Sequence, residues 1–191
     1  MQSGRVLDLF RQCGALLEGH FQLSSGLHSP GYLQCALVLQ HPEHAAGLGA
    51  AIAERVSSLQ PRLVLSPALG GVVIGHEVAR ALGVRAQFAE RREGVLTLRR
   101  GFRIEPDEPV LIVEDVITTG GSTRETAKVA ALAGGRVVGA AAVINRGGPD
   151  VDVGAPLHAL ADVSWPTYLP EDCLLCGQHA ELTKPGSNPG S

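Results

Sequence analysis

Features typical of several protein classes are missing from this chain of 191 residues. No run of Lys or Arg exceeds two residues, and the net charge is −3 with a pI near 6.1, so the basic face of a nucleic-acid-binding domain is not evident. No hydrophobic run approaches the length that spans a bilayer, and residues 1–11 lack the apolar core of a signal peptide. We therefore expect a cytoplasmic protein that acts on small molecules, without nucleic-acid or membrane partners.

Cysteine is also scarce, and the four cysteines do not suggest a disulfide framework. Cys173 and Cys176, followed by His179, have the spacing of metal ligands, but no fourth ligand is evident nearby. One such pair is a weak indication of zinc. A surface turn with reduced thiols is the favoured interpretation, and no protein-bound metal is expected.

The common nucleotide-binding loops are absent as well. No Gly-Lys-Ser/Thr tripeptide is present, which excludes a P-loop. The segment Gly47-Leu-Gly49 lies in an Ala-rich helical stretch and follows no strand, so it does not fit a dinucleotide-binding turn.

What is present favours one α/β domain over residues 1–191, because 45% of the residues are hydrophobic and 18% are charged. Strand-like and helix-like segments alternate, which is typical of a parallel sheet flanked by helices. The expected helices cover residues 3–17, 42–59, 72–82 and 124–132. The expected strands cover residues 31–39, 63–66, 87–89, 110–113 and 136–144, with a charged hairpin-like loop at 90–103 and a mobile tail at 184–191.

The most informative segment runs from Val110 to Thr123. Apolar residues of strand character lead into the acids Glu114 and Asp115, and a loop of hydroxyl and glycine residues follows before the next helix. Backbone N–H groups in such a loop, with the positive end of a helix, bind phosphate. Paired carboxylates beside that site suit the hydroxyl groups of a phosphorylated sugar. A simple helix cap would explain one hydroxyl, but not this whole pattern.

This segment resembles the signature of type I phosphoribosyltransferases. The resemblance implies that Glu114 and Asp115 contact the ribose of phosphoribosyl pyrophosphate (PRPP) and that the following turn holds its 5′-phosphate. It also implies a mostly parallel central sheet flanked by helices, with a small N-terminal hood at about residues 19–36 over the base site. The implied PRPP-binding residues are Glu114, Asp115, Val116, Ile117, Thr118, Thr119, Gly120, Gly121 and Ser122.

Two further segments look like the orotate phosphoribosyltransferase family. Residues 19–33 match its N-terminal pattern, which places Tyr32 and Leu33 against orotate, with Ser24 where many members carry Lys. Arg146, after the strand at 136–144, stands where that family binds the base together with Thr118. An always-charged, planar guanidinium suits the carboxylate of orotate, whereas a purine acceptor gives no reason for the charge.

The resemblance also implies which residues bind the leaving pyrophosphate. Ala68, Leu69 and Gly70 stand where the family binds pyrophosphate, and Gly70 replaces a Lys found in some relatives. The related catalytic loop is usually rich in Lys, so Arg91, Arg92, Arg99 and Arg100 are the cations available here, with Arg91 and Arg92 taken as catalytic. Mg²⁺ is expected to bind mainly to substrate oxygens, and the family precedent is a homodimer with shared active sites.

The sequence therefore favours an Mg-dependent orotate phosphoribosyltransferase of pyrimidine (UMP) biosynthesis, a transferase of the glycosyltransferase class. Two alternatives stay open. One is a purine phosphoribosyltransferase, and the other is a regulator that senses PRPP with the same fold.

Overall fold

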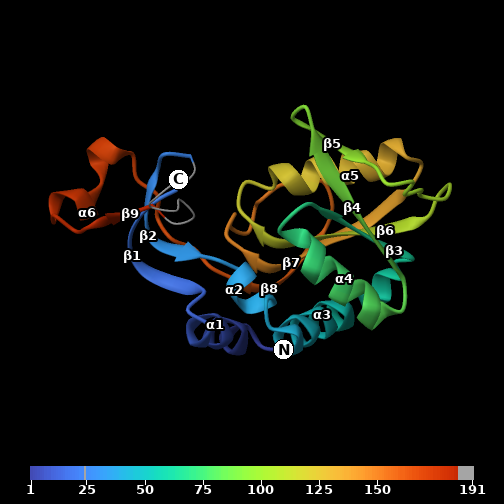
Figure 1. Cartoon of the computed structure of the whole chain (residues 1–191), viewed down its shortest axis with the longest axis horizontal. Coiled ribbons are helices and arrows are strands. Elements are labelled where there is room, and N and C mark those ends of the chain that lie inside the picture. Colours follow the sequence, from blue (N-terminus) through green and yellow to red (C-terminus); the bar gives the residue numbers. More distant parts are fainter. Residues whose placement is uncertain (24, 185–191) are drawn as a thin grey trace.

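The structure is a computed structural model that describes residues 1–23 and 25–184, and its strands form two sheets (Figure 1). The large sheet has six strands in the order β5-β4-β3-β6-β7-β8. All neighbouring pairs from β4 to β8 are parallel, and β5 is antiparallel to β4 at one edge. These strands are β3 (Leu63–Pro67), β4 (Arg85–Arg92), β5 (Val95–Leu98), β6 (Pro109–Ile117), β7 (Arg136–Asn145) and β8 (Leu157–Asp162).

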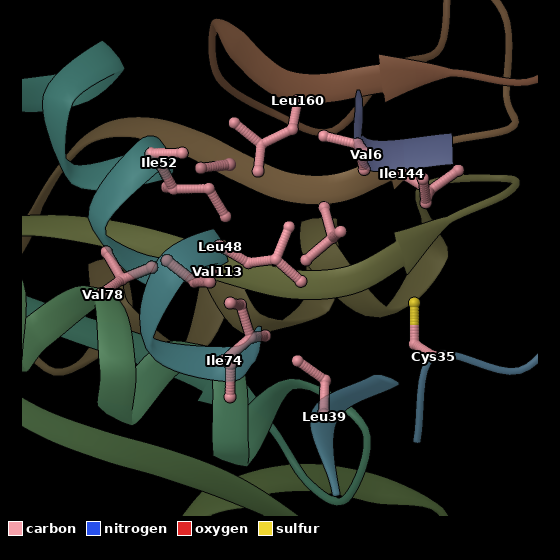
Figure 2. Packing of buried hydrophobic residues seen from close by; sticks show 14 of the residues in the cluster. Val6, Cys35, Leu39, Leu48, Ile52, Ile74, Val78, Val113, Ile144 and Leu160 are labelled. Atoms are coloured by element: carbon pink, nitrogen blue, oxygen red, sulfur yellow. The ribbon is translucent and has the colours of Figure 1, made fainter. Parts of the chain in front are cut away.

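Helices cover both faces of the large sheet, as expected for a parallel sheet buried on two sides. On one face lie α1 (Ser3–Gln12), α3 (Pro42–Val56) and α4 (Gly71–Leu82), and on the other lies α5 (Gly121–Leu132). Residues of β6 alternate between the two faces, because successive side chains of a strand point in opposite directions. Leu111 and Val113 join the cluster under α3 and α4, part of which Figure 2 shows, whereas Val110 and Ile112 pack with the cluster under α5.

The small sheet lies beside the large one and has the strand order β2-β1-β9 (Figure 1). The expected hood is here an antiparallel hairpin of β1 (Leu16–Gln22) and β2 (His28–Leu33). The third strand, β9 (Leu182–Thr183), comes from the far end of the described chain and runs parallel to β1. Three short helices complete the chain: α2 (Ala36–Leu39), η1 (Ser57–Leu59) and α6 (Leu174–Gly177), with a further 3-10 turn, η2 (Pro170–Asp172).

Several expected boundaries are wrong. The first helix ends at Gln12 instead of continuing to Leu17, because Gly14 takes a positive φ of 62° and Leu16 begins β1. The strand expected at 31–39 ends at Leu33, and residues 36–39 form α2 instead. A short apolar run is compatible with a buried strand or a buried helical turn, so periodicity cannot separate the two.

The strands β1, β8 and β9 were missed altogether. The strand at 136–144 was expected to be the last of the sheet, but β8 pairs with β7 beyond it. β8 is an edge strand with His158 and Asp162 among its six residues, so its apolar signal is weak. The expected mobile tail at 184–191 lies outside the described residues except for Lys184, and so does Ser24. Among the described helices, none is long and apolar enough to cross a bilayer.

Candidate active site

The order of strands in the large sheet marks where a ligand site should lie. The chain moves from β3 to β4 on one side, and from β6 to β7 and β8 on the other. In open α/β sheets, ligands bind at such a switch point, outside the carboxyl ends of the strands. The two loops at this position are residues 68–70 after β3 and residues 118–120 after β6. They carry half of the predicted donor-binding residues, and the others lie in the adjoining ends of β6 and α5.

The loop after β3 lies directly against the acids of β6. A Cβ atom added to Gly70 would stand 2.8 Å from Oδ1 of Asp115. A Cβ on Gly71 would stand 2.9 Å from the Val113 carbonyl oxygen and 3.2 Å from Oε1 of Glu114. Both distances are too short for an ordinary side chain. Glycine at position 70, where some relatives have Lys, therefore allows this close approach, and the backbone of the loop faces the acids.

The two acids lie side by side at the end of β6, and Glu114 is protonated at neutral pH in the ligand-free protein. Glu114 is buried, and this burial raises the pKa of its carboxyl group to about 9, with the neighbouring charge of Asp115 as the next cause. None of the ion pairs between described residues includes either acid. A pair of carboxylates without a cationic partner suits sugar hydroxyl groups, and it suits positive charge that is brought by a ligand.

The raised pKa of Glu114 gives a prediction for stability against pH. The folded carboxyl keeps its proton up to about pH 9, whereas the unfolded one loses it near pH 4.3. Over this window the folded state binds more protons, so Glu114 makes the free energy of unfolding fall as pH rises, by up to about 1.4 kcal/mol per pH unit. Glu114→Gln cannot titrate, so its free energy of unfolding should fall less between pH 6 and pH 8 than that of the wild type.

Urea unfolding of the ligand-free protein at both pH values measures this difference. Glu54→Gln, at an exposed position of α3, is the matched control and should keep the wild-type slope. Equal slopes for the wild type and Glu114→Gln would show that Glu114 is ionised in the fold at neutral pH.

The turn after β6 has the geometry of an anion site. Thr118, Thr119 and Ser122 are exposed around it, and no side chain caps the N-terminus of α5. The backbone N–H groups at this end are therefore available to a phosphate, which the positive end of the helix also favours. Gly120 has a φ of 73°, and a Cβ at this position would collide with the Asp152 carbonyl oxygen. Only glycine both adopts this positive φ easily and lacks the Cβ atom that would collide.

Neighbouring groups fix the shape of this turn. Arg124 donates hydrogen bonds to the carbonyl oxygens of Thr119, at 2.9 Å, and of Asp152. Two predicted PRPP-binding residues have side chains that pack into the core. The side chain of Ile117 is buried in the core under α5 and cannot reach a ligand, and Val116 is half-buried against the opposite core cluster.

The predicted base site forms around Arg146, directly after β7. Its backbone N–H donates to the Ile117 carbonyl oxygen at 2.7 Å, which ties it to the donor turn. Its guanidinium carbon lies 4.9 Å from the centre of the Trp165 ring, and its buried Nε has no hydrogen-bond partner among the described residues. Burial lowers the pKa of Arg146, and Tyr32 partly offsets this effect. A half-buried cation without an anionic partner indicates that an anionic ligand completes the site.

The two hood residues predicted at the base site differ in their exposure. The hydroxyl of Tyr32 donates to Oε1 of Gln34 at 3.2 Å, and the ring is half-exposed. The side chain of Leu33 is buried in the core cluster, so only its backbone can face a base. Trp165 lies against the backbone of Gly31, where a Cβ would overlap its ring.

Sequence reasoning missed two residues near the acids and Arg146. Trp165 was not among the predicted site residues, although it is the single Trp of the chain and its ring lies under the guanidinium of Arg146. Cys35 was expected in a strand, but it is buried beside the acids; burial, then Asp115 and Glu114, raises the pKa of its thiol. Its spacing along the chain gave no signal of this position.

The charged loop forms the β4–β5 hairpin, and its arginines differ in their partners. Arg91 forms an ion pair with Glu125 of α5, and Arg100 forms one with Glu90, each at 2.8 Å. Arg92 lies 3.7 Å from Glu93. Arg99 is exposed and takes part in no ion pair within the described ranges. Arg92 and Arg99 are therefore the arginines freest to meet a departing pyrophosphate, whereas Arg91 holds the hairpin against α5.

Comparison with known proteins agrees with this arrangement. Residues 36–157 match the phosphoribosyl transferase domain family. The orotate phosphoribosyltransferase of Pelotomaculum thermopropionicum is 49% identical over 187 residues, covering 98% of both chains. That of Novosphingobium aromaticivorans is 50% identical over 190 residues, again covering 98% of both.

Solved structures support the same fold. A crystal structure of Mycobacterium tuberculosis orotate phosphoribosyltransferase in complex with inorganic phosphate gives a TM-score of 0.67 at 22% identity and covers 84% of this chain and 95% of that one. An adenine phosphoribosyltransferase from Trypanosoma brucei gives 0.59 at 19% identity and covers 81% of this chain and 79% of that one. The fold alone is therefore shared by enzymes with different acceptor bases.

Proposed function

This chain belongs to the orotate phosphoribosyltransferases of the phosphoribosyl transferase domain family, and from this premise we propose that it transfers the phosphoribosyl group of PRPP to orotate in pyrimidine biosynthesis. The products are orotidine 5′-monophosphate and pyrophosphate. The choice of acceptor rests on Arg146, a half-buried cation that has no anionic partner in the described part of the chain and lies over Trp165 beside the donor turn. The carboxylate of orotate supplies the missing anion, and neutral adenine or hypoxanthine does not.

The donor is held by three groups of residues. The turn at 118–122 binds the 5′-phosphate through its backbone N–H groups and hydroxyls, because the uncapped end of α5 opens there. Glu114 and Asp115 accept hydrogen bonds from the ribose hydroxyls. The backbone of Ala68, Leu69 and Gly70, which lies against Asp115, binds the pyrophosphate.

In the reaction, the bond between C1′ and the pyrophosphate oxygen breaks and its electron pair leaves with pyrophosphate. A bond from N1 of orotate to C1′ forms, and the N1 proton of orotate passes to the leaving pyrophosphate or to water. Positive charge develops on the ribose ring between these events. The carboxylates of Glu114 and Asp115 stabilise this charge, and arginines of the β4–β5 hairpin compensate the charge that leaves.

The acids also fit a divalent cation, since they lie side by side without a cationic partner in the described chain. Mg²⁺ held mainly by PRPP oxygens would neutralise part of the pyrophosphate charge, and Asp115 could supply a protein carboxylate to it. Donor binding would then lower the pKa of Glu114, because added positive charge favours its ionised form.

We further propose that the protein works as a homodimer with shared active sites. Leu69 and Val73, which flank the acids on the β3 side, are 86% and 46% exposed. Together with Leu39 they line an apolar pocket beside Asp115. A second copy covering this rim would remove apolar surface from water and exclude solvent from the donor site.

A panel of acceptor bases tests the proposed activity. Pyrophosphate release is measured with PRPP and Mg²⁺ in the presence of orotate, uracil, adenine or hypoxanthine. We expect rapid release with orotate and little with the other three, because only orotate carries a carboxylate for Arg146. Faster release with adenine or hypoxanthine would replace this proposal by a purine phosphoribosyltransferase. Donor binding without release for any base would favour the sensing regulator.

A further inference from the structure

Four side chains that could bind a metal meet outside the active site. They are His20 of β1, His28 of β2, and Cys173 and Cys176 at the start and within α6, and their ligand atoms all lie within 4.8 Å of one another. His20, His28 and Cys173 are buried. Figure 1 shows why the sequence does not reveal the cluster, since α6 and β9 return to the N-terminal hairpin from the opposite end of the chain.

Three nitrogen–sulfur distances match those of ligands around one tetrahedral ion. Nε2 of His20 lies 3.5 Å from Sγ of Cys173 and 3.7 Å from Sγ of Cys176, and Nδ1 of His28 lies 3.4 Å from Sγ of Cys176. Zinc bonds of about 2.3 Å to sulfur and about 2.05 Å to nitrogen place tetrahedral N and S ligands about 3.6 Å apart. The two histidine nitrogens are 2.9 Å apart, slightly closer than the roughly 3.3 Å that zinc requires.

A backbone contact orients one of the histidines as a metal ligand. Nδ1 of His20 lies 3.0 Å from the Ala180 carbonyl oxygen, which can only accept a hydrogen bond. Nδ1 therefore carries the proton, and the lone pair of Nε2 points toward the two thiols. Metal-bound histidines commonly donate their other ring N–H to a carbonyl or carboxylate in this way, which fixes the tautomer.

The segment that carries the cysteines has little else to hold it. From residue 162 to residue 184, all of them described, Cys173 alone is buried. The large apolar residues nearby remain open to water, with Leu169 50%, Leu174 66% and Leu182 44% exposed. Backbone pairing adds little: β9 pairs with β1 through two residues, and Tyr168 forms one isolated bridge with His28. Small units without an apolar core usually depend on a metal or on disulfides.

We propose that His20, His28, Cys173 and Cys176 bind one structural zinc ion, which fastens the C-terminal segment to the β1–β2 hairpin. Two thiolates and two imidazoles in a tetrahedral arrangement favour zinc over the oxygen-preferring Mg²⁺ or Ca²⁺. Four protein ligands leave no open position, so the ion takes no part in phosphoribosyl transfer. Its role is to keep β2 with Tyr32, and the chain that carries Trp165, in place around Arg146.

This site differs from the one that spacing along the sequence suggests. His179 follows Cys176 closely but does not belong to the cluster, and its backbone takes a positive φ of 55°. Cys173 is buried and not part of an exposed turn. The third and fourth ligands come from the hairpin, more than a hundred residues away.

Metal content of the untagged full-length protein, measured by elemental analysis, tests the assignment. We expect about one zinc per chain in the wild type and less than about a tenth of that in His20→Ala and Cys173→Ser. His179→Ala and Cys13→Ser are the matched controls and should keep their zinc, since His179 and Cys13 lie outside the cluster. A wild type without zinc after growth in zinc-supplemented medium overturns the proposal, and so does loss of zinc in His179→Ala with retention in His20→Ala.

A second measurement on the wild type does not depend on the folding of any variant. Cys173 and Cys176 should resist alkylation in the native protein and react after a strong chelator is added, as mass spectrometry of the peptides would show. Equal alkylation with and without chelator would mean that the histidines and thiols merely hydrogen-bond to one another. Neither metal content nor alkylation depends on turnover, so these experiments test the zinc site independently of the proposed activity.

Discussion

Asp115→Asn should lower kcat for pyrophosphate release by about 100-fold to 1,000-fold, the typical effect of removing one group that stabilises transition-state charge. Asparagine keeps the size of the side chain but loses the negative charge that faces the ribose ring. The same change removes the charge of Asp115 as a cause of the raised pKa of Glu114. The free energy of unfolding at pH 8 should therefore stay equal to that of the wild type or increase.

Steady-state kinetics with saturating PRPP and orotate, together with urea unfolding, separates the two effects. Asp8→Asn is the matched control, because Asp8 is an exposed acid that pairs with Arg11 on α1, away from the site. It should keep wild-type turnover. Near-normal turnover of a folded Asp115→Asn would remove Asp115 from the ribose site, and lost turnover with lost stability would make its role structural.

Arg146→Ala should raise the KM for orotate at least about 30-fold and change the KM for PRPP much less. Loss of one partner from a buried, hydrogen-bonded charge pair costs about 2–5 kcal/mol, and each 1.4 kcal/mol is a factor of about ten. The guanidinium of Arg146 lies over Trp165, whereas the backbone N–H of Arg146 is bonded to the Ile117 carbonyl oxygen beside the donor turn. Alanine keeps this backbone bond and removes only the side chain from the base site. Initial rates with each substrate varied in turn measure both constants.

Two variants sharpen this test. Arg146→Lys keeps the charge but loses the planar pair of donors, so its KM for orotate should lie between those of the wild type and Arg146→Ala. Arg136→Ala removes an exposed arginine that pairs with Asp107 at the opposite end of β7, and it should leave both constants unchanged. Equal increases of both KM values in Arg146→Ala would show that Arg146 shapes the whole cleft instead of binding the base.

The elements around the predicted donor site could be predicted from the sequence because they are contiguous. Strand, acids, turn and helix follow one another from Val110 to Leu132, and the structure has them in that order. The parallel arrangement of the central strands was also predicted, since alternation of strands and helices leaves few other topologies. The family comparisons then confirm the fold and the kinship with orotate phosphoribosyltransferases.

Features that depend on distant contacts could not be predicted. Trp165 reaches Arg146 only because the chain after β8 crosses back to the hairpin, and the partners of Cys173 lie on β1 and β2. The ion pairs of Arg91 and Arg100 likewise depend on how the β4–β5 hairpin folds against its neighbours. Local sequence patterns carry no information on contacts between residues that are far apart in the chain. The boundary errors at residues 13–17 and 34–39 have a different cause, since short apolar runs fit both kinds of element.

The pairing of β9 with β1 has a consequence for the order in which the protein matures on the ribosome. His20 pairs with Leu182, so the hairpin is synthesised long before the strand that completes its sheet. The loops that surround Glu114 and the turn at 118–122 emerge earlier, together with the strands that support them. The small sheet is therefore completed last, after the elements that carry Glu114 and the turn at 118–122 have been synthesised.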